Sequence, residues 1–167
     1  MNQQLALLMA EAAIEGPADE PLRLAFGLAC AGRARHLLED PRAVQCLEVL
    51  QACVAGRCSP PQFAQARELI ADIARGHRGS PSIDGTSHAA VSATYSVAHA
   101  LAGHALEAAN YAAYAAVYAY GGYAISDPTA YAAEFEWQVQ KWTELIHSHR
   151  AATESLSMVA KPSHFRT

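Results

Sequence analysis

The chain has 167 residues, a mass of 17.8 kDa and a formal net charge of −4. This length suits one domain with a buried core, and 51% apolar against 17% charged residues excludes a disordered or fibrous protein. The negative net charge argues against nucleic acid as a partner, because proteins bind the anionic phosphate backbone through a basic surface. Alanine is abundant and β-branched segments are few, which predicts an all-α fold.

Turn and cap signals divide the first half of the chain into four expected helices. They cover about residues 2–15, 19–38, 40–56 and 59–76. Asp40-Pro41 is a typical start, because aspartate accepts a hydrogen bond at the N-cap and proline lacks only an N–H that would be unpaired there. A polar loop rich in turn formers follows over residues 76–86.

The most unusual segment lies between Arg78 and Lys141, where no lysine or arginine occurs. Its alanine-rich part predicts one long helix over residues 87–120, at the centre of the bundle, which Gly121-Gly122 closes. Gly103 alone interrupts it. Because glycine in a helix interior costs about 1 kcal/mol relative to alanine, we expect a close neighbouring backbone or a local kink there.

Asp127-Pro128 repeats the start signal and predicts a sixth helix to about His149. The remaining segment has no strong period, so residues 151–167 are expected to form a flexible tail after a helical domain over residues 1–150. The predicted architecture is therefore a single-domain bundle of about six helices around a long alanine-rich central helix.

The four cysteines give no metal or redox motif, because none forms a CxxC pair. Cys46 and Cys53 fall on an apolar helical face, which favours small core residues over a disulfide. We therefore expect a reducing, cytoplasmic setting. The N-terminal segment lacks the basic start of a secretory signal, and the polar groups of the alanine-rich segment argue against a membrane span.

A line of polar groups runs along the expected central helix. His88 and His99 are eleven residues apart, and Asn110 is eleven further on, so they share a face of one continuous helix. Such a seam could bind a ligand or a partner. The alternative is that these groups are buried and bond neighbouring helices, as buried polar groups must.

His104 and Glu107 lie three residues apart and so share one side of a helix. A metal site needs three or four converging ligands, and this spacing supplies one pair, so we predict no metal and no cofactor. No nucleophile elbow, phosphate loop or dinucleotide fingerprint occurs, so catalysis is not the favoured function. A ligand-binding or enzymatic bundle remains the alternative, with His99, His104, Glu107 and Asn110 lining a pocket.

The tyrosines of the central segment indicate an interface. Tyr111, Tyr114 and Tyr118 form a helical stripe, and tyrosine is enriched at protein–protein contacts. A stripe that only covers the end of the bundle, or that joins two copies in a homodimer, would look the same. Glu134 and Glu136 could add an acidic face for a basic partner.

Several of these features resemble the Imm-5-like group of putative bacterial immunity proteins. The similarity covers roughly residues 22–145. It rests on Cys30, Arg33 and Leu37-Leu38, on Asp40-Pro41-Arg42, and on the run AGHALEAANYA at residues 102–112. The most specific piece is Gly103-His104-Ala105-Leu106. Where the family tends to carry a histidine four residues before His104, this chain has His99 five before it.

The resemblance implies a small helical protein that neutralises a cognate toxin by binding it. The acidic balance suits a basic toxin such as a nuclease, because opposite fields speed association. The competing hypotheses are the ligand-binding bundle and a structural homo-oligomer joined through the tyrosines.

Overall fold

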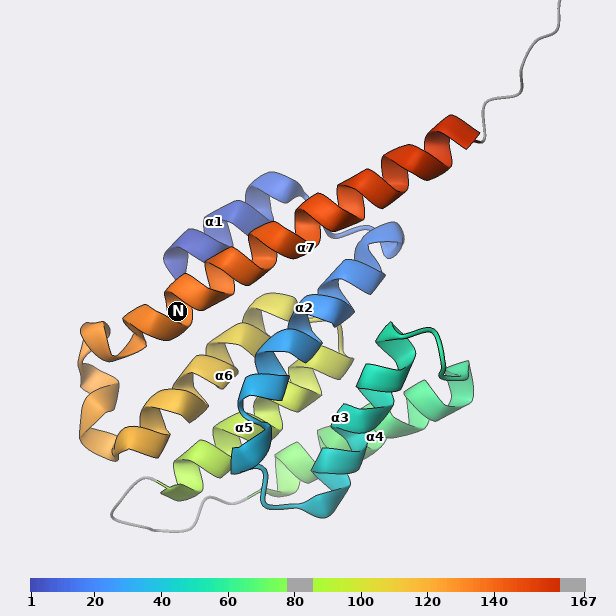
Figure 1. Ribbon diagram of the computed structural model, residues 1–167. Coiled ribbons are helices and arrows are strands. Elements are labelled where there is room, and N and C mark those ends of the chain that lie inside the picture. Colours follow the sequence, from blue (N-terminus) through green and yellow to red (C-terminus); the bar gives the residue numbers. More distant parts are fainter. Residues whose placement is uncertain (78–85, 160–167) are drawn as a thin grey trace, which may run out of the picture.

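The computed structural model describes residues 1–77 and 86–159 of the chain. These residues form seven α-helices and four 3-10 segments, and no strand occurs among them (Figure 1). The all-α prediction is confirmed. The helix count differs from six for one reason, which lies in the alanine-rich segment.

The first four helices follow the sequence signals. They are α1 (Gln3–Ala12), α2 (Glu20–Arg33), α3 (Pro41–Val54) and α4 (Pro60–Gly76). The Asp40 side chain accepts a hydrogen bond from the Arg42 N–H at 2.8 Å, and Ser59 closes a capping box with Gln62. Both starts are therefore the predicted ones, because these side chains satisfy N–H groups that the helix leaves unpaired.

The expected helix over residues 87–120 is wrong, because the chain reverses in its middle. It forms α5 (Thr86–Leu101) and α6 (Ala105–Tyr120), which pack side by side as an antiparallel hairpin. Gly103 has φ +74°, in the left-handed region that glycine enters without steric cost. The Ser96 hydroxyl then donates to the Ala108 carbonyl at 2.8 Å across the two helices. The glycine that was expected to cost helix stability instead forms the turn.

Helix α2 lies across the inner face of this hairpin (Figure 1). The approach is close: a Cβ placed on Gly27 would meet the Cα and Cβ of Ala100 at 3.0 Å. Buried alanines such as Ala93 and Ala115 pack beside Ala34 at the same interface. The alanine richness therefore serves helix–helix contact, because small side chains let backbones approach.

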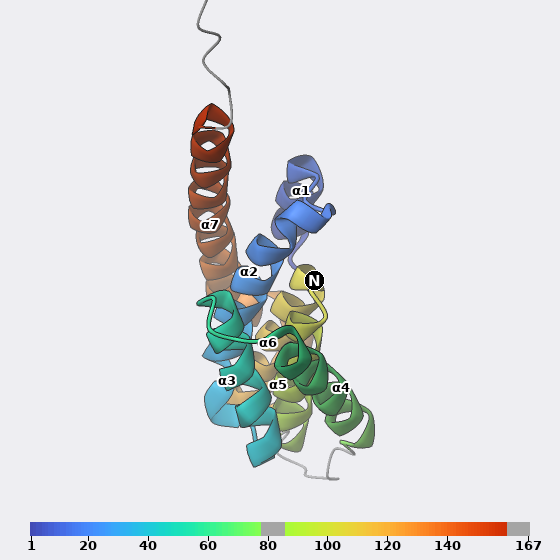
Figure 2. The same ribbon diagram turned by 90° about the vertical axis from the view of Figure 1, so that its right-hand side faces the viewer.

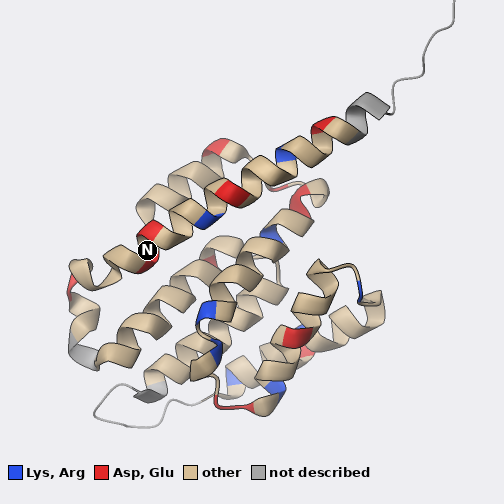
Figure 3. Ribbon diagram, in the orientation of Figure 1, with Lys and Arg blue, Asp and Glu red and all other residues tan. Residues whose placement is uncertain are grey.

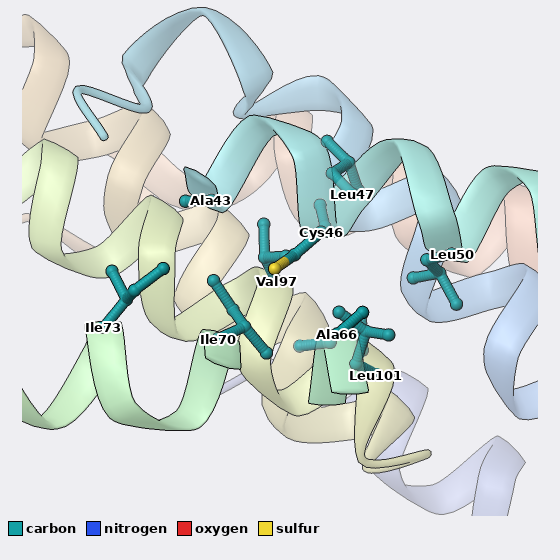
Figure 4. Packing of buried hydrophobic residues seen from close by; sticks show 12 residues of the cluster. Ala43, Cys46, Leu47, Leu50, Ala66, Ile70, Ile73, Val97 and Leu101 are labelled. Carbon is teal, nitrogen blue, oxygen red and sulfur yellow. The ribbon is translucent and has the colours of Figure 1, made fainter. Parts of the chain in front are cut away.

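Larger aliphatic side chains fill the space between the hairpin and the α3–α4 pair. Figure 4 shows Ile70, Val97 and Leu101 meeting there from α4 and α5, with Leu47 and Leu50 from α3. All five are buried. This cluster anchors α3 and α4 to α5.

Helix α7 (Ala132–Val159) forms the opposite side with α1, and its last turns project beyond the other helices (Figures 1 and 2). Phe26 and Trp142 meet edge to face with ring centroids 5.3 Å apart, which joins α7 to α2. The helix continues past His149, where the sequence predicted its end. The remainder of the expected tail, residues 160–167, lies outside the described residues. So does most of the expected loop, residues 78–85.

The cysteines correct one prediction. Cys53 is not a small core residue: it is half-buried and forms a disulfide with Cys58, across the link between α3 and α4. Cys30 and Cys46 are free and buried, and burial raises the pKa of both thiols, which keeps them neutral. The disulfide removes the cysteine-based argument for a reducing compartment.

Charge is concentrated away from the hairpin. In Figure 3 the ribbons of α5 and α6 are almost free of charged residues, and Glu107 is the single formal charge of the two helices. In the described part of the chain, no helix has the length and apolarity required to cross a membrane.

Candidate functional site

The outer side of the α5–α6 hairpin carries a set of neighbouring tyrosine and histidine rings, which we name the aromatic–histidine face. Its members are His88, Tyr95, His99, His104, Tyr111, Tyr114 and Tyr118. His88 and His104 are exposed, and the other five are half-buried. The face combines apolar ring surface with polar tips, as protein interfaces do.

The hairpin builds this face from two helices. On α5, His88, Tyr95 and His99 follow at offsets of seven and four, so they point one way. The buried Ala93 and Ala100 point the other way, toward α2. The turn at Gly103 then brings the α6 tyrosines alongside. The rings therefore fill the groove between the helices on the side turned away from α2.

Parallel stacking holds the middle of the face together. The Tyr111 ring lies 5.2 Å from the Tyr95 ring and 5.2 Å from the His99 ring, at interplanar angles of 22° and 9°. His88 stacks on Tyr118 at 5.2 Å farther along the groove. Such pairs each contribute about 0.5–1.5 kcal/mol beyond area burial, so they order the rings while leaving them half-exposed.

The face continues into the start of α7. Tyr114 meets Tyr131 edge to face at 5.8 Å, and Tyr131 stacks on Phe135 at 5.4 Å. Tyr131 lies in η4 (Pro128–Tyr131), is buried, and donates its hydroxyl to the Ile125 carbonyl at 3.2 Å. Burial raises the pKa of this phenol, so it stays a neutral donor. Because Tyr131 is held by this hydrogen bond, its contact also holds the Tyr114 ring in place.

At the turn, His99 and His104 face each other. Their Nδ1 atoms are 3.4 Å apart, and their rings are tilted by 41°. Burial lowers the pKa of His99, His104 lowers it further, and the exposed carboxylate of Glu107 opposes the shift. The neutral form of His99 is therefore favoured. His99, His104 and Glu107, three of the predicted site residues, are therefore neighbours at the turn.

Other predicted residues lie elsewhere. The continuous seam through His88, His99 and Asn110 does not form, because it required one unbroken helix. Asn110 instead accepts a hydrogen bond from the Asn2 N–H at 3.4 Å. The Asn2 side chain donates to Gln138 at 3.1 Å, so Asn110 belongs to a contact that ties the N-terminus of α1 to α6 and α7.

The two predicted acidic residues also lie apart from the aromatic–histidine face. Glu134 is 8% exposed and receives hydrogen bonds from two nitrogens of Arg33, at 2.8–3.0 Å. Arg33 also lies 4.2 Å from the centre of the Trp137 ring. Glu136 is exposed and receives a hydrogen bond from Gln140. The charge of Glu134 is thus already paired within the chain.

Beside the Arg33–Glu134 pair is a cavity of about 470 Å³. Small side chains of α6 and α7 leave this space open, and they include Ala112, Ala116 and Ala133. Tyr120, at the end of α6, forms part of its lining and is 79% exposed. Tyr120 is therefore an exposed tyrosine of α6 that is separate from the aromatic–histidine face.

Sequence reasoning missed Tyr95, which is central to the stacking. The signal was present: Tyr95 and His99 lie four residues apart on one helix, and glycine follows shortly after them. A hairpin at Gly103 would have paired them with Tyr111. Among the described residues, no group of three or more His, Cys, Asp or Glu is arranged to hold a metal ion.

The comparisons with known proteins agree with the resemblance. Residues 24–145 match the family described as Imm-5 like putative immunity protein. The chain belongs to this family. The match includes the whole aromatic–histidine face and the Arg33–Glu134 pair. No curated protein and no solved structure matches the chain.

Proposed function

We propose that this chain is an immunity-type protein that neutralises a cognate toxin by binding it through the aromatic–histidine face. Membership of the Imm-5 like family supports the immunity role. The observation that carries the choice of surface is the stacked, half-exposed ring system around Tyr111. No catalytic step is needed, because occlusion of the toxin is sufficient.

The physical character of the face suits tight binding. Its rings are held by their neighbours, so little side-chain freedom remains to be lost on association. Tyrosines of this kind dominate binding energy when a partner excludes water from them. Glu107 and the paired histidines supply polar groups at one end of an otherwise uncharged surface.

The overall charge of −4 favours a basic toxin, such as a nuclease. Opposite fields accelerate association, and salt screens them. We therefore expect the association rate to fall as ionic strength rises. Glu136→Lys, which reverses an exposed charge, should slow association further, whereas reversing Glu134 would break its internal pair with Arg33. An association rate that does not respond to salt would argue against a basic partner.

Co-expression with candidate toxins in a bacterial host tests the proposal. The chain should restore growth against its cognate toxin, and the purified proteins should form a stable complex. Tyr111→Ala should weaken this complex by about 2 kcal/mol or more, as at a central interface residue. Tyr120→Ala is the matched control, since it removes an exposed tyrosine of the same helix outside the face.

Each result has a distinct meaning. Loss of protection in Tyr111→Ala but not in Tyr120→Ala would support both the role and the surface. Equal protection by both variants would place binding elsewhere on the chain. If a folded chain protects against none of the candidate toxins and forms no complex, the immunity role itself fails.

A further inference from the structure

The paired histidines at the α5–α6 turn have a geometry that hydrogen bonding does not explain well. Their Nδ1 atoms face each other at 3.4 Å. Hydrogen bonds from a ring N–H are typically about 2.7–3.2 Å long, so this one would be weak. The His104 side chain also caps no N–H of α6, although it stands at the N-cap. Within the described residues, neither ring has another hydrogen-bond partner.

The same separation fits two nitrogen ligands of one metal ion. Imidazole nitrogens bind Zn²⁺ at about 2.0–2.1 Å, and a tetrahedral angle then places two of them about 3.3–3.4 Å apart. The observed separation is 3.4 Å. The separation of the two Nδ1 atoms therefore fits an ion bound between them.

The backbone holds this pair in place. Leu101 ends α5 and Ala105 begins α6, and Gly103, at φ +74°, makes the reversal between them. The His104 N–H donates to the His99 carbonyl at 2.9 Å, which ties the two residues together directly. On its other side, the His99 ring stacks on Tyr111 and Tyr95. The His99 ring and the His104 backbone are thus positioned before any ion binds, which reduces the ordering cost of binding.

The charged groups near the turn are one acid and one held arginine. Glu107 is the one formal charge on the two helices, and its field reaches His99. One cation approaches the turn: a Cβ placed on Gly103 would lie 3.8 Å from Nε of Arg23, whose Nη1 donates to the carbonyls of Ile14 and Gly16. His104 is exposed, so the remaining coordination positions are open to water or to a donor atom of a partner. Two histidines alone are fewer ligands than a closed structural site has, which makes this an exchangeable surface site.

We propose that His99 and His104 form a two-histidine site for a transition-metal ion of the Zn²⁺ class, with both Nδ1 atoms as ligands. Imidazole favours zinc, copper, nickel and iron over calcium or magnesium. Glu107 supports the site through its charge. This site does not depend on the proposed immunity function and can be tested without a toxin.

Zinc binding by the full-length, metal-free protein is measured by competition with a chromophoric zinc indicator. The wild type should bind one equivalent of Zn²⁺, and His104→Ala and His99→Ala should each lose it. His147→Ala is the control, because it removes an exposed histidine of α7 and should keep the bound equivalent. Circular dichroism checks the fold of each variant; His104 is exposed, so its variant remains decisive if His99→Ala misfolds.

Cobalt(II) as a second probe identifies the ligands. Its absorption spectrum should show nitrogen and oxygen coordination without a sulfur charge-transfer band, which excludes the cysteines as ligands. Absence of zinc binding by the wild type would overturn the proposal. An equivalent that persists in folded His104→Ala, or that disappears in His147→Ala, would place the ion elsewhere and would also overturn it.

Discussion

The two faces of the α5–α6 hairpin differ in almost every physical respect, although one alanine-rich segment builds both. The inner face is buried and closely packed, with Ala100 against Gly27 and Leu101 in the aliphatic cluster. The outer face is half-exposed and holds stacked rings around Tyr111. One face secures the hairpin to the bundle, and the other remains available to a partner.

This contrast explains why the segment is rich in both alanine and tyrosine. Alanine allows α2 to approach the hairpin, and it loses no side-chain entropy on burial. Tyrosine on the opposite side covers the groove between the helices with large rings. Substitutions on the inner face should therefore change the free energy of unfolding, and those on the outer face should mainly change binding.

The largest expected change in stability comes from Leu101→Ala. Leu101 is 0% exposed and packs in the cluster that joins α5 to α3 and α4. Truncation should lower the free energy of unfolding by about 2–5 kcal/mol, since it removes buried surface and leaves a cavity. Urea denaturation measures this. A loss below about 1 kcal/mol would contradict the close packing of the inner face.

Gly27→Ala should have the next largest effect. The added Cβ would lie 3.0 Å from Ala100 atoms, one of them backbone, so α2 and α5 must separate. The expected loss is about 1–3 kcal/mol, as for overpacking in a core. Gly32→Ala in the same helix is the control. It meets nothing within 4 Å, and it should stabilise by up to about 1 kcal/mol through helix propensity. Equal effects at both glycines would contradict the close approach.

Tyr111→Ala should change stability less. The ring contacts Tyr95, His99 and Tyr114, but it is half-exposed. We expect a loss of about 1.5 kcal/mol, with each of the three ring pairs at the low end of its range, measured by the same denaturation. If the loss reached that of Leu101→Ala, the outer face would be a second structural core and the contrast between the faces would fail.

The smallest effect is a pH dependence from His99. Burial beside His104 holds the folded-state pKa below the usual 6.5, and Glu107 only partly offsets this. Tyr95 and Tyr111 stack on the ring and contribute to its burial. As pH falls through about 6.5, the unfolded chain takes up this proton before the folded chain does, so stability decreases.

Metal-free protein in the presence of a chelator allows this slope to be measured. His99→Gln should be less sensitive to pH than the wild type between about pH 7.5 and pH 5.5. Identical slopes in the two proteins would show that His99 is equally easy to protonate in both states.

Much of the fold could be predicted from local chemistry. Asp40 and Ser59 mark helix starts because their side chains satisfy the first N–H groups, and the structure forms both caps. Gly103 was harder, because a glycine within alanine is compatible with a continuous helix, a kink or a turn. Tertiary packing decided among these, since two short helices bury alanine faces against α2 that one long helix could not.

The candidate site depended on that choice. The sequence grouped His99, His104, Glu107 and Asn110 around one pocket. Tyr95 was left out of the prediction, because its contact with Tyr111 exists only in the hairpin. The assignment of Asn110 to the seam depended on an unbroken helix. The Cys53–Cys58 disulfide was missed because residue spacing alone does not reveal how closely two chain segments approach.

The most direct test of the two-face account is hydroxyl-radical footprinting of the chain, alone and in complex with a toxin against which it is found to protect. This method reports the exposure of individual side chains. The account predicts that oxidation of Tyr95, Tyr111 and Tyr118 falls in the complex while that of Tyr120 is unchanged. Protection of Tyr120 or of the α3–α4 surface, with the aromatic–histidine face still reactive, would contradict it.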